Sequence, residues 1–135
     1  MELTLPFYRK EPFDRFKRYG DFHREGGPAI IKYFEESICS KTYYIDGRLH
    51  REDGPAVVDY DEDGRLLSES YFVNGKHHRD GAPAYIEYYK GKPISESYYI
   101  KGALHREDGP AYILYDVDEE SHYLEEYYIA GIKIK

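Results

Sequence analysis

Histidine and arginine stand side by side at four places in the chain, and both side chains can bind ligands. The pairs recur every 27 or 28 residues: His23–Arg24, His50–Arg51, His78–Arg79 and His105–Arg106. Histidines that bind one zinc ion each lie about 2.0–2.1 Å from it. If each pair belongs to one β-hairpin, equivalent histidines lie two strands apart, about 10 Å. We therefore expect no shared metal site and no cofactor.

Nucleophilic catalysis has equally few candidates. The single cysteine, Cys39, falls in an alternating segment where Leu67 and Ile94 stand in later units, which indicates a small buried side chain. Ser68 and Ser95 recur as part of one strand face, whereas a catalytic serine is normally a single residue at a sharp turn. The glycines are not clustered into a phosphate-binding loop. This pattern favours a protein that is not an enzyme.

The four arginines have two interpretations. In a structural role, each guanidinium pairs with an acid of its own segment, such as Asp53 or Asp108, and the histidines bond to turn backbone. The arginines could instead reach the second-strand glutamates Glu69, Glu96 and Glu125. In a binding role, the His-Arg pairs line one edge about 10 Å apart and hold an anionic small molecule. Recurrence in every unit favours the structural role.

A second candidate surface is aromatic. Each unit closes with an aromatic pair, and the third and fourth units add one tyrosine each in the first strand. The expected partner-binding residues are Tyr44, Phe72, Tyr85, Tyr99, Tyr112 and Tyr128. Tyrosine is frequent among residues that dominate binding energy. Unit three also differs from the others at His77 and at Ala82, which replaces a glycine. The alternative is that these rings only pack along a thin sheet.

All of these residues are carried by a tandem repeat. Four units begin at Gly20, Gly47, Gly75 and Gly102, and a fifth begins at Gly131. In every unit a tyrosine follows the opening glycine by 13 positions, and the closing aromatic pair begins 4 positions before the next glycine. Only the stretch between them varies, from 10 to 12 positions. The variable stretch is therefore the tolerant turn.

Alternating β-branched and aromatic residues on both sides of this turn predict a β-hairpin rather than a helix. One face of the first strand is uniform, as in Ala56, Val58 and Tyr60, and we expect it to be packed. The other face varies and is expected to face solvent. The H-R-x-x-G-P segment is the expected connection to the next hairpin. The prediction is an all-β, elongated antiparallel β-meander of four hairpin repeats over residues 20–135.

The ends of the chain depart from the repeat. Residues 1–19 are predicted to cap the first strand edge, because an open edge invites aggregation. The apolar side chains available for this cap are Leu3, Leu5, Phe7, Phe13 and Phe16. At the other end, residues 131–135 alternate isoleucine with lysine, which is typical of an edge strand. Pairing through this edge would make the chain a self-associating scaffold.

The amino-acid composition limits the classes of function that the chain can have. The chain has 135 residues, about one domain, with 19 Lys and Arg against 26 Asp and Glu and a formal net charge of -7. This balance argues against direct nucleic-acid binding. The mean hydropathy of -0.80 is low, yet 17% of residues are aromatic and can build a fold. No apolar run approaches the ~18 residues of a membrane span. A single cysteine and a start without a signal peptide predict a cytoplasmic location.

The pattern Y-Y-x-x-G, then H-R-x-x-G-P-A, then Y resembles MORN-type repeats over residues 20–131. It is most similar to the bacterial and viral variant with E-x-Y-Y-x-x-G-K, seen as Glu69–Lys76. The unit is longer than the usual MORN unit and has a fixed His-Arg pair. The resemblance implies a meandering sheet that binds a partner, without catalytic residues, and one bacterial set is labelled as antitoxins.

From the residues and the resemblance, we expect a non-catalytic module that masks a protein target, as an antitoxin-like or virus-encoded inhibitor. The alternative is a sponge for an anionic small molecule or signalling nucleotide, held by the His-Arg loops and by tyrosine stacking.

Overall fold

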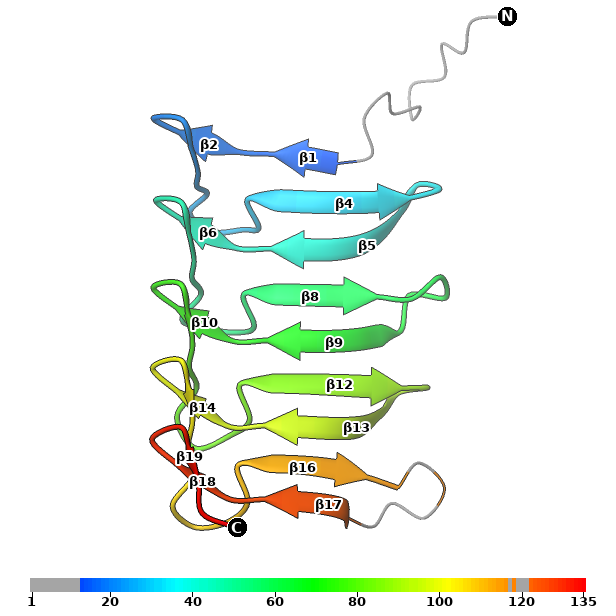
Figure 1. Cartoon of the computed structure of the whole chain (residues 1–135). Helices are drawn as coiled ribbons and strands as arrows, with labels where there is room; N and C mark the ends of the chain where they lie inside the picture. The colour runs from blue at the N-terminus through cyan, green and yellow to red at the C-terminus, as the bar shows by residue number, and fades with distance from the viewer. Residues whose placement is uncertain (1–12, 117, 119–121) are drawn as a thin grey trace, which may run out of the picture.

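The computed structural model of the chain describes residues 13–116, 118 and 122–135. Within these ranges, nine strands form one antiparallel sheet whose spatial order follows the sequence without a crossover (Figure 1). They are β1 (Phe13–Arg15), β4 (Ile30–Phe34), β5 (Ser37–Thr42), β8 (Val57–Tyr60), β9 (Leu66–Ser70), β12 (Tyr85–Tyr89), β13 (Lys92–Ser97), β16 (Tyr112–Tyr115) and β17 (His122–Glu126). The predicted all-β antiparallel meander is confirmed. The described ranges contain no helix that could cross a membrane.

β1 forms the first edge of the sheet and pairs with β4. Just after it, Phe16 donates its N–H to the carbonyl of Ala29 at 2.8 Å, and Tyr43 makes the equivalent bond one unit later. The structural repeat therefore begins before the sequence repeat does. The other residues expected in the cap, Leu3, Leu5 and Phe7, lie outside the described residues.

Each repeat also contains a second, short hairpin, which corrects the expectation that the H-R-x-x-G-P segment alone connects the long hairpins. In the part of the chain that the structure describes, these pairs are β2 (Lys17–Arg18) with β3 (Asp21–Phe22), β6 (Tyr44–Ile45) with β7 (Arg48–Leu49), β10 (Phe72–Val73) with β11 (Lys76–His77), β14 (Tyr99–Ile100) with β15 (Ala103–Leu104), and β18 (Tyr128–Ile129) with β19 (Ile132–Lys133). Two consecutive positive φ angles make each turn, as at Asn74 (49°) and Gly75 (81°). This is the geometry of the tight hairpin turns that Asn-Gly favours.

The short hairpins stack on one another along one side of the sheet (Figure 1). The N–H of Gly75 donates to the carbonyl of Leu49 at 2.8 Å, and that of Gly102 donates to the carbonyl of His77 at the same distance. Neighbouring repeats are therefore joined twice, once in the large sheet and once in this stack.

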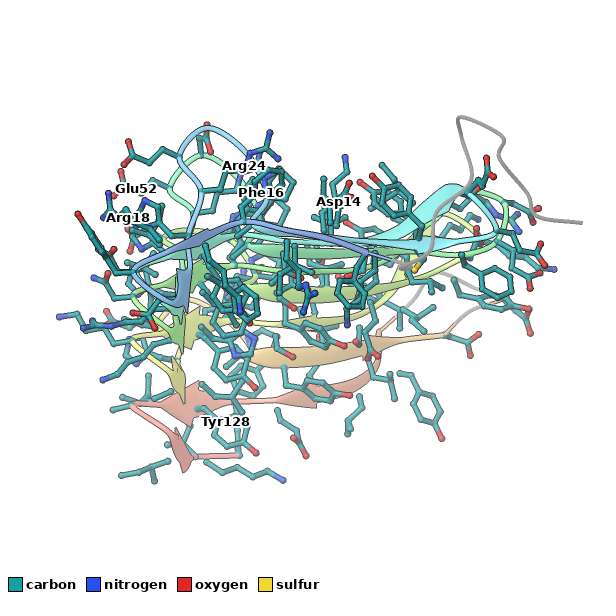
Figure 2. The ribbon with its side chains drawn as sticks, turned by 90° about the horizontal axis from the view of Figure 1, so that it is seen from above. Asp14, Phe16, Arg18, Arg24, Glu52 and Tyr128 are labelled. Atoms are coloured by element: carbon teal, nitrogen blue, oxygen red, sulfur yellow. The ribbon has the colours of Figure 1, made fainter. Side chains whose placement is uncertain are left out.

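The uniform face of the sheet is packed, as expected. Its buried side chains are small or branched: Ala29, Ala56, Val58, Ala84, Ile86, Ala111 and Ile113. The H-R-x-x-G-P loops lie on this side, and Figure 2 shows Arg24 together with Phe16 there.

The opposite face does not match the expectation of a solvated surface. Ser95 and Ser97 are only 1% and 5% exposed. In the register of the sheet, Ser97 lies between Tyr85 and Tyr112 of the neighbouring strands. The larger side chains cover the serines, so this face is partly buried.

Each long hairpin contains a β-bulge that the strict alternation of the sequence conceals. Lys32 pairs with Ser40 but Tyr33 pairs with Ile38, which leaves Cys39 as the extra residue. The same shift leaves Leu67 unpaired in the next hairpin. Cys39 is free and half-buried, not fully buried as predicted, because a bulged residue is displaced from the regular pleat.

Candidate functional site

Each histidine of the His-Arg pairs uses both ring nitrogens. Nδ1 of His50 accepts the backbone N–H of Asn74 at 3.0 Å, and its Nε2 lies 3.3 Å from the carboxylate of Glu52. Because Nδ1 is an acceptor, the proton of the neutral ring lies on Nε2. The same backbone bond recurs at 2.9–3.0 Å in three other pairs: His23 with Asp46, His78 with Lys101, and His105 with Ala130. The histidines therefore hold the turn backbone of the next short hairpin.

The residue held in this way has a left-handed backbone. φ is 49° at Lys101 and 48° at Ala130, a conformation that costs a non-glycine residue on the order of 1–3 kcal/mol. The hydrogen bond that the backbone N–H donates to the histidine Nδ1 stabilises this conformation, which explains why the histidine recurs in every repeat.

Each arginine of the pairs stacks on the aromatic ring that lies eight positions earlier in the chain. Cζ of Arg51 lies 4.0 Å from the ring centroid of Tyr43, and its Nη1 donates to the carbonyl of Pro55 at 3.1 Å. The equivalent stacks, at 3.9–4.1 Å, are Arg24 on Phe16, Arg79 on Tyr71 and Arg106 on Tyr98. The expected pairing within the loop also occurs, since Nε of Arg51 lies 3.1 Å from Asp53.

Two of the second-strand glutamates, Glu69 and Glu96, accept hydrogen bonds from tyrosine hydroxyls. The Tyr88 hydroxyl donates to Glu69 at 2.6 Å, and the Tyr115 hydroxyl donates to Glu96 at 2.6 Å. The guanidinium groups are held beside the prolines, at the start of the strand. Burial raises the pKa of Tyr88 and Tyr115 well above the ordinary range, and the accepting carboxylates raise it further.

Successive His-Arg loops enclose shallow hollows. One, of about 360 Å³, is lined by Arg79 of one repeat and by His105, Arg106 and Glu107 of the next. An equivalent hollow of about 350 Å³ has Arg24, His50 and Arg51 in its lining. The structure thus brings the predicted anion-binding residues together in neighbouring loops, but acidic side chains share each hollow. Among the described residues, no three His, Cys, Asp or Glu side chains gather as a metal site would require.

The predicted aromatic residues lie on the other side of the molecule. The short hairpins face the part of the sheet that carries Tyr85 and Tyr112. We call this combined surface the corner face, and it comprises Tyr44, Phe72, His77, Tyr99 and Tyr128 from the short hairpins and Asp59, Tyr85, Glu87 and Tyr112 from the sheet. The ring centroids of His77 and Tyr85 are 6.2 Å apart, which places the two parts in contact.

His77 is the centre of the corner face. Its ring centroid lies 4.0 Å from that of Phe72 and 4.8 Å from that of Tyr99, with which it is stacked. Burial lowers the pKa of His77, so the neutral imidazole is favoured. The structure therefore brings three predicted residues, Phe72, Tyr85 and Tyr99, together around a histidine that the sequence marks only as a departure from the repeat.

The remaining predicted aromatics lie farther along the same surface. The Tyr44 ring packs against Phe22 with centroids 5.3 Å apart. The Tyr128 hydroxyl lies 3.4 Å from Glu126. Lysines stand at the two ends of the hairpin stack, where Lys17 lies over the Phe22 ring and Lys133 pairs with Glu126 at 3.0 Å.

Two carboxylates of the corner face are fixed by hydroxyl groups. The Ser95 hydroxyl donates to Glu87 at 2.8 Å, and the Ser68 hydroxyl donates to Asp59 at 3.1 Å. Burial and the Glu87 carboxylate raise the pKa of Tyr85 and of Tyr112, so both rings lie within the field of Glu87. In the described part of the chain, no basic side chain forms an ion pair with either acid.

Comparisons of the chain with protein-family models, with curated proteins and with solved structures gave no match.

Proposed function

We propose that the chain is a non-catalytic binding module that masks a protein target with its corner face. The observation that carries this proposal is the cluster of Phe72, Tyr85 and Tyr99 around His77, half-buried and continuous with Tyr112 on the sheet. Half-buried aromatic rings have little rotamer freedom left to lose, so a partner gains contact area at low entropic cost.

The shape of this surface suits a macromolecule better than a small molecule. The corner face runs across several repeats, each about 10 Å from the next. The chain carries a net charge of -7, so a basic target is favoured. Concretely, we propose an antitoxin-like or virus-encoded inhibitor that acts in the cytoplasm by covering the working surface of its target. The likeness of the repeat to MORN-type repeats supports this role.

A second candidate function is a sponge for an anionic small molecule. The hollow between Arg79 and the next His105–Arg106 pair favours it, since cationic groups of two repeats meet there. The same guanidinium groups, however, already stack on aromatic rings and bind proline carbonyls. The masking role is therefore our first proposal.

The test begins with native mass spectrometry of the tagged chain recovered from lysate of its host. A gain of kilodaltons reports a protein partner, and a gain of a few hundred daltons reports a retained small ligand. The partner must then be lost when Tyr85, Tyr99 and Tyr112 are all replaced by alanine. The matched control replaces three exposed tyrosines outside the corner face, Tyr19, Tyr89 and Tyr123.

Circular dichroism and thermal unfolding must show that both triple variants remain folded. Retention of the partner by the folded corner-face variant would overturn the masking proposal. A complex of two or more copies without another protein would favour the scaffold alternative.

A further inference from the structure

The sheet face that carries Tyr85 and Tyr112 contains a row of side chains that repeats with the pitch of the sheet and runs beyond both ends of the corner face. Lys32, Asp59, Glu87 and Leu114 take the same register position in four successive repeats, separated by the serines of the intervening strands. One strand lies between each member and the next, so neighbouring members are two strand spacings apart, about 10 Å. The two acids are therefore neighbours in the row, with a cation before them and an apolar residue after them.

The carboxylates of Asp59 and Glu87 are oriented and available to bind a cationic group of a partner. Each carboxylate is oriented by a serine hydroxyl of the adjacent strand, and no described basic side chain neutralises it. Tyr85 lies within the electrostatic field of both Glu87 and Asp59. A cation placed between them would gain both carboxylate pairing and contact with an aromatic ring.

The chain itself shows which cation fits such a combination. Four arginines stack on aromatic rings at about 4 Å inside the repeats, including Arg51 on Tyr43. A planar guanidinium can lie on a ring and donate to a carboxylate at the same time, which an ammonium group does less well. The corner face supplies the ring and the carboxylate, and an arginine of a partner protein would complete the same arrangement.

The spacing of the acids fixes the geometry of the partner. A polyproline II chain advances about 3.1 Å per residue and has three residues per turn, so its side chains three positions apart lie on the same face. In a β-strand, side chains three positions apart point to opposite faces. Three residues of a polyproline II chain span about 9.3 Å, which matches the pitch between Asp59 and Glu87. Spacings of two or four residues give about 6.2 Å or 12.4 Å and miss this pitch.

From this match, we infer that the corner face binds a protein segment in the polyproline II conformation, laid across the strands, that carries arginines three residues apart for Asp59 and Glu87. This inference rests on the proposed masking function and names the part of the target that is recognised. The row also gives the segment a polarity, because Lys32 favours an acidic residue at one end and Leu114 favours an apolar residue at the other.

The experiment uses the full chain and three fluorescein-labelled peptides of identical composition. Each peptide has two arginines in a proline and serine background that favours polyproline II, separated by two, three or four positions. Fluorescence anisotropy at low salt gives the three dissociation constants. We expect the peptide with arginines at i and i+3 to bind about threefold or more tighter than the other two, a difference of about 0.7 kcal/mol.

Two single variants of equal net charge show where the peptide binds. Glu87→Gln keeps the acceptor for Ser95 but removes the charge, and it should abolish the spacing preference. Glu62→Gln removes one exposed charge at the turn between β8 and β9 and should leave the preference intact. Asp59→Asn provides a second removal on the row, and thermal unfolding verifies that each variant is folded.

Equal binding of the three peptides, or no binding, would overturn the inference. So would an equal effect of Glu87→Gln and Glu62→Gln, since only non-specific attraction to an acidic protein would then remain. None of these results tests the masking function. That function is tested by whether the triple tyrosine variant loses the captured partner.

Discussion

Replacement of Arg51 by alanine tests whether the His-Arg loops are structural. The side chain loses its stack on Tyr43, worth about 1 kcal/mol for a guanidinium that is 26% exposed. It also loses the hydrogen bond to the Pro55 carbonyl, worth about 1 kcal/mol. The pair with Asp53 adds little, because that carboxylate is 89% exposed. We expect the free energy of unfolding to fall by about 2 kcal/mol.

Urea unfolding followed by far-ultraviolet circular dichroism measures this change, with an unchanged slope as the sign that the folded state is intact. A double-mutant cycle with Tyr43→Ala isolates the stack, for which we expect a coupling of about 1 kcal/mol. Tyr43→Phe is the matched control. Because Phe16 already carries Arg24 in the first repeat at 4.0 Å, this variant should keep most of the coupling.

A loss below about 0.3 kcal/mol, within the range of ordinary surface substitutions, would refute the structural role. In that case the four arginines would be free to serve the anionic ligand of the second candidate function. Loss of a retained ligand from a variant of unchanged stability would also refute it, by an independent measurement.

Three further predictions follow from single contacts. The protein should lose stability below about pH 6.5, because burial lowers the pKa of His77 in the folded state and the unfolded chain binds the proton more tightly. His77→Leu should remove this loss, which thermal unfolding at several pH values would detect. Tyr88→Phe should reduce the loss of stability above about pH 10, because the Tyr88 hydroxyl buried against Glu69 keeps its proton in the folded state while the unfolded chain releases it. Urea titrations from about pH 8 to 11 would show the difference. Gly54→Ala should lower the melting temperature, since the new Cβ would lie 2.8 Å from Cζ of Arg51 and displace it from its ring; an unchanged melting temperature would count against the tight packing of the loop.

The long hairpins can be predicted from the sequence because Val58 and Tyr60 alternate with polar residues over enough positions to define a period. The short hairpins are harder, since two-residue strands such as Phe72–Val73 show no period. Only the Asp46–Gly47 and Asn74–Gly75 pairs signal two of them. The bulge at Cys39 is hidden for a related reason, because an extra residue in one strand is visible only when its partner strand is known.

The aromatic surface, too, could be predicted from the sequence only in part. The sequence identifies Phe72, Tyr85 and Tyr99 and marks His77 as unusual, but it does not bring them together. Their contact depends on two sets of hydrogen bonds, one within the large sheet and one within the stack of short hairpins. The position of the short hairpins relative to the large sheet cannot be inferred from the alternation of residues within either.

The direction of the histidine bonds bears on how the chain is synthesised. In each case the ring follows one short hairpin and the turn belongs to the next short hairpin, as with His50 and Asn74, which are 24 positions apart. A ribosome therefore delivers the acceptor before the turn that needs it, and each completed repeat is a template for the one emerging behind it. Removal of one whole repeat would bring an equivalent histidine and turn together again, so chains of this kind can shorten or lengthen by whole units during evolution without a new junction.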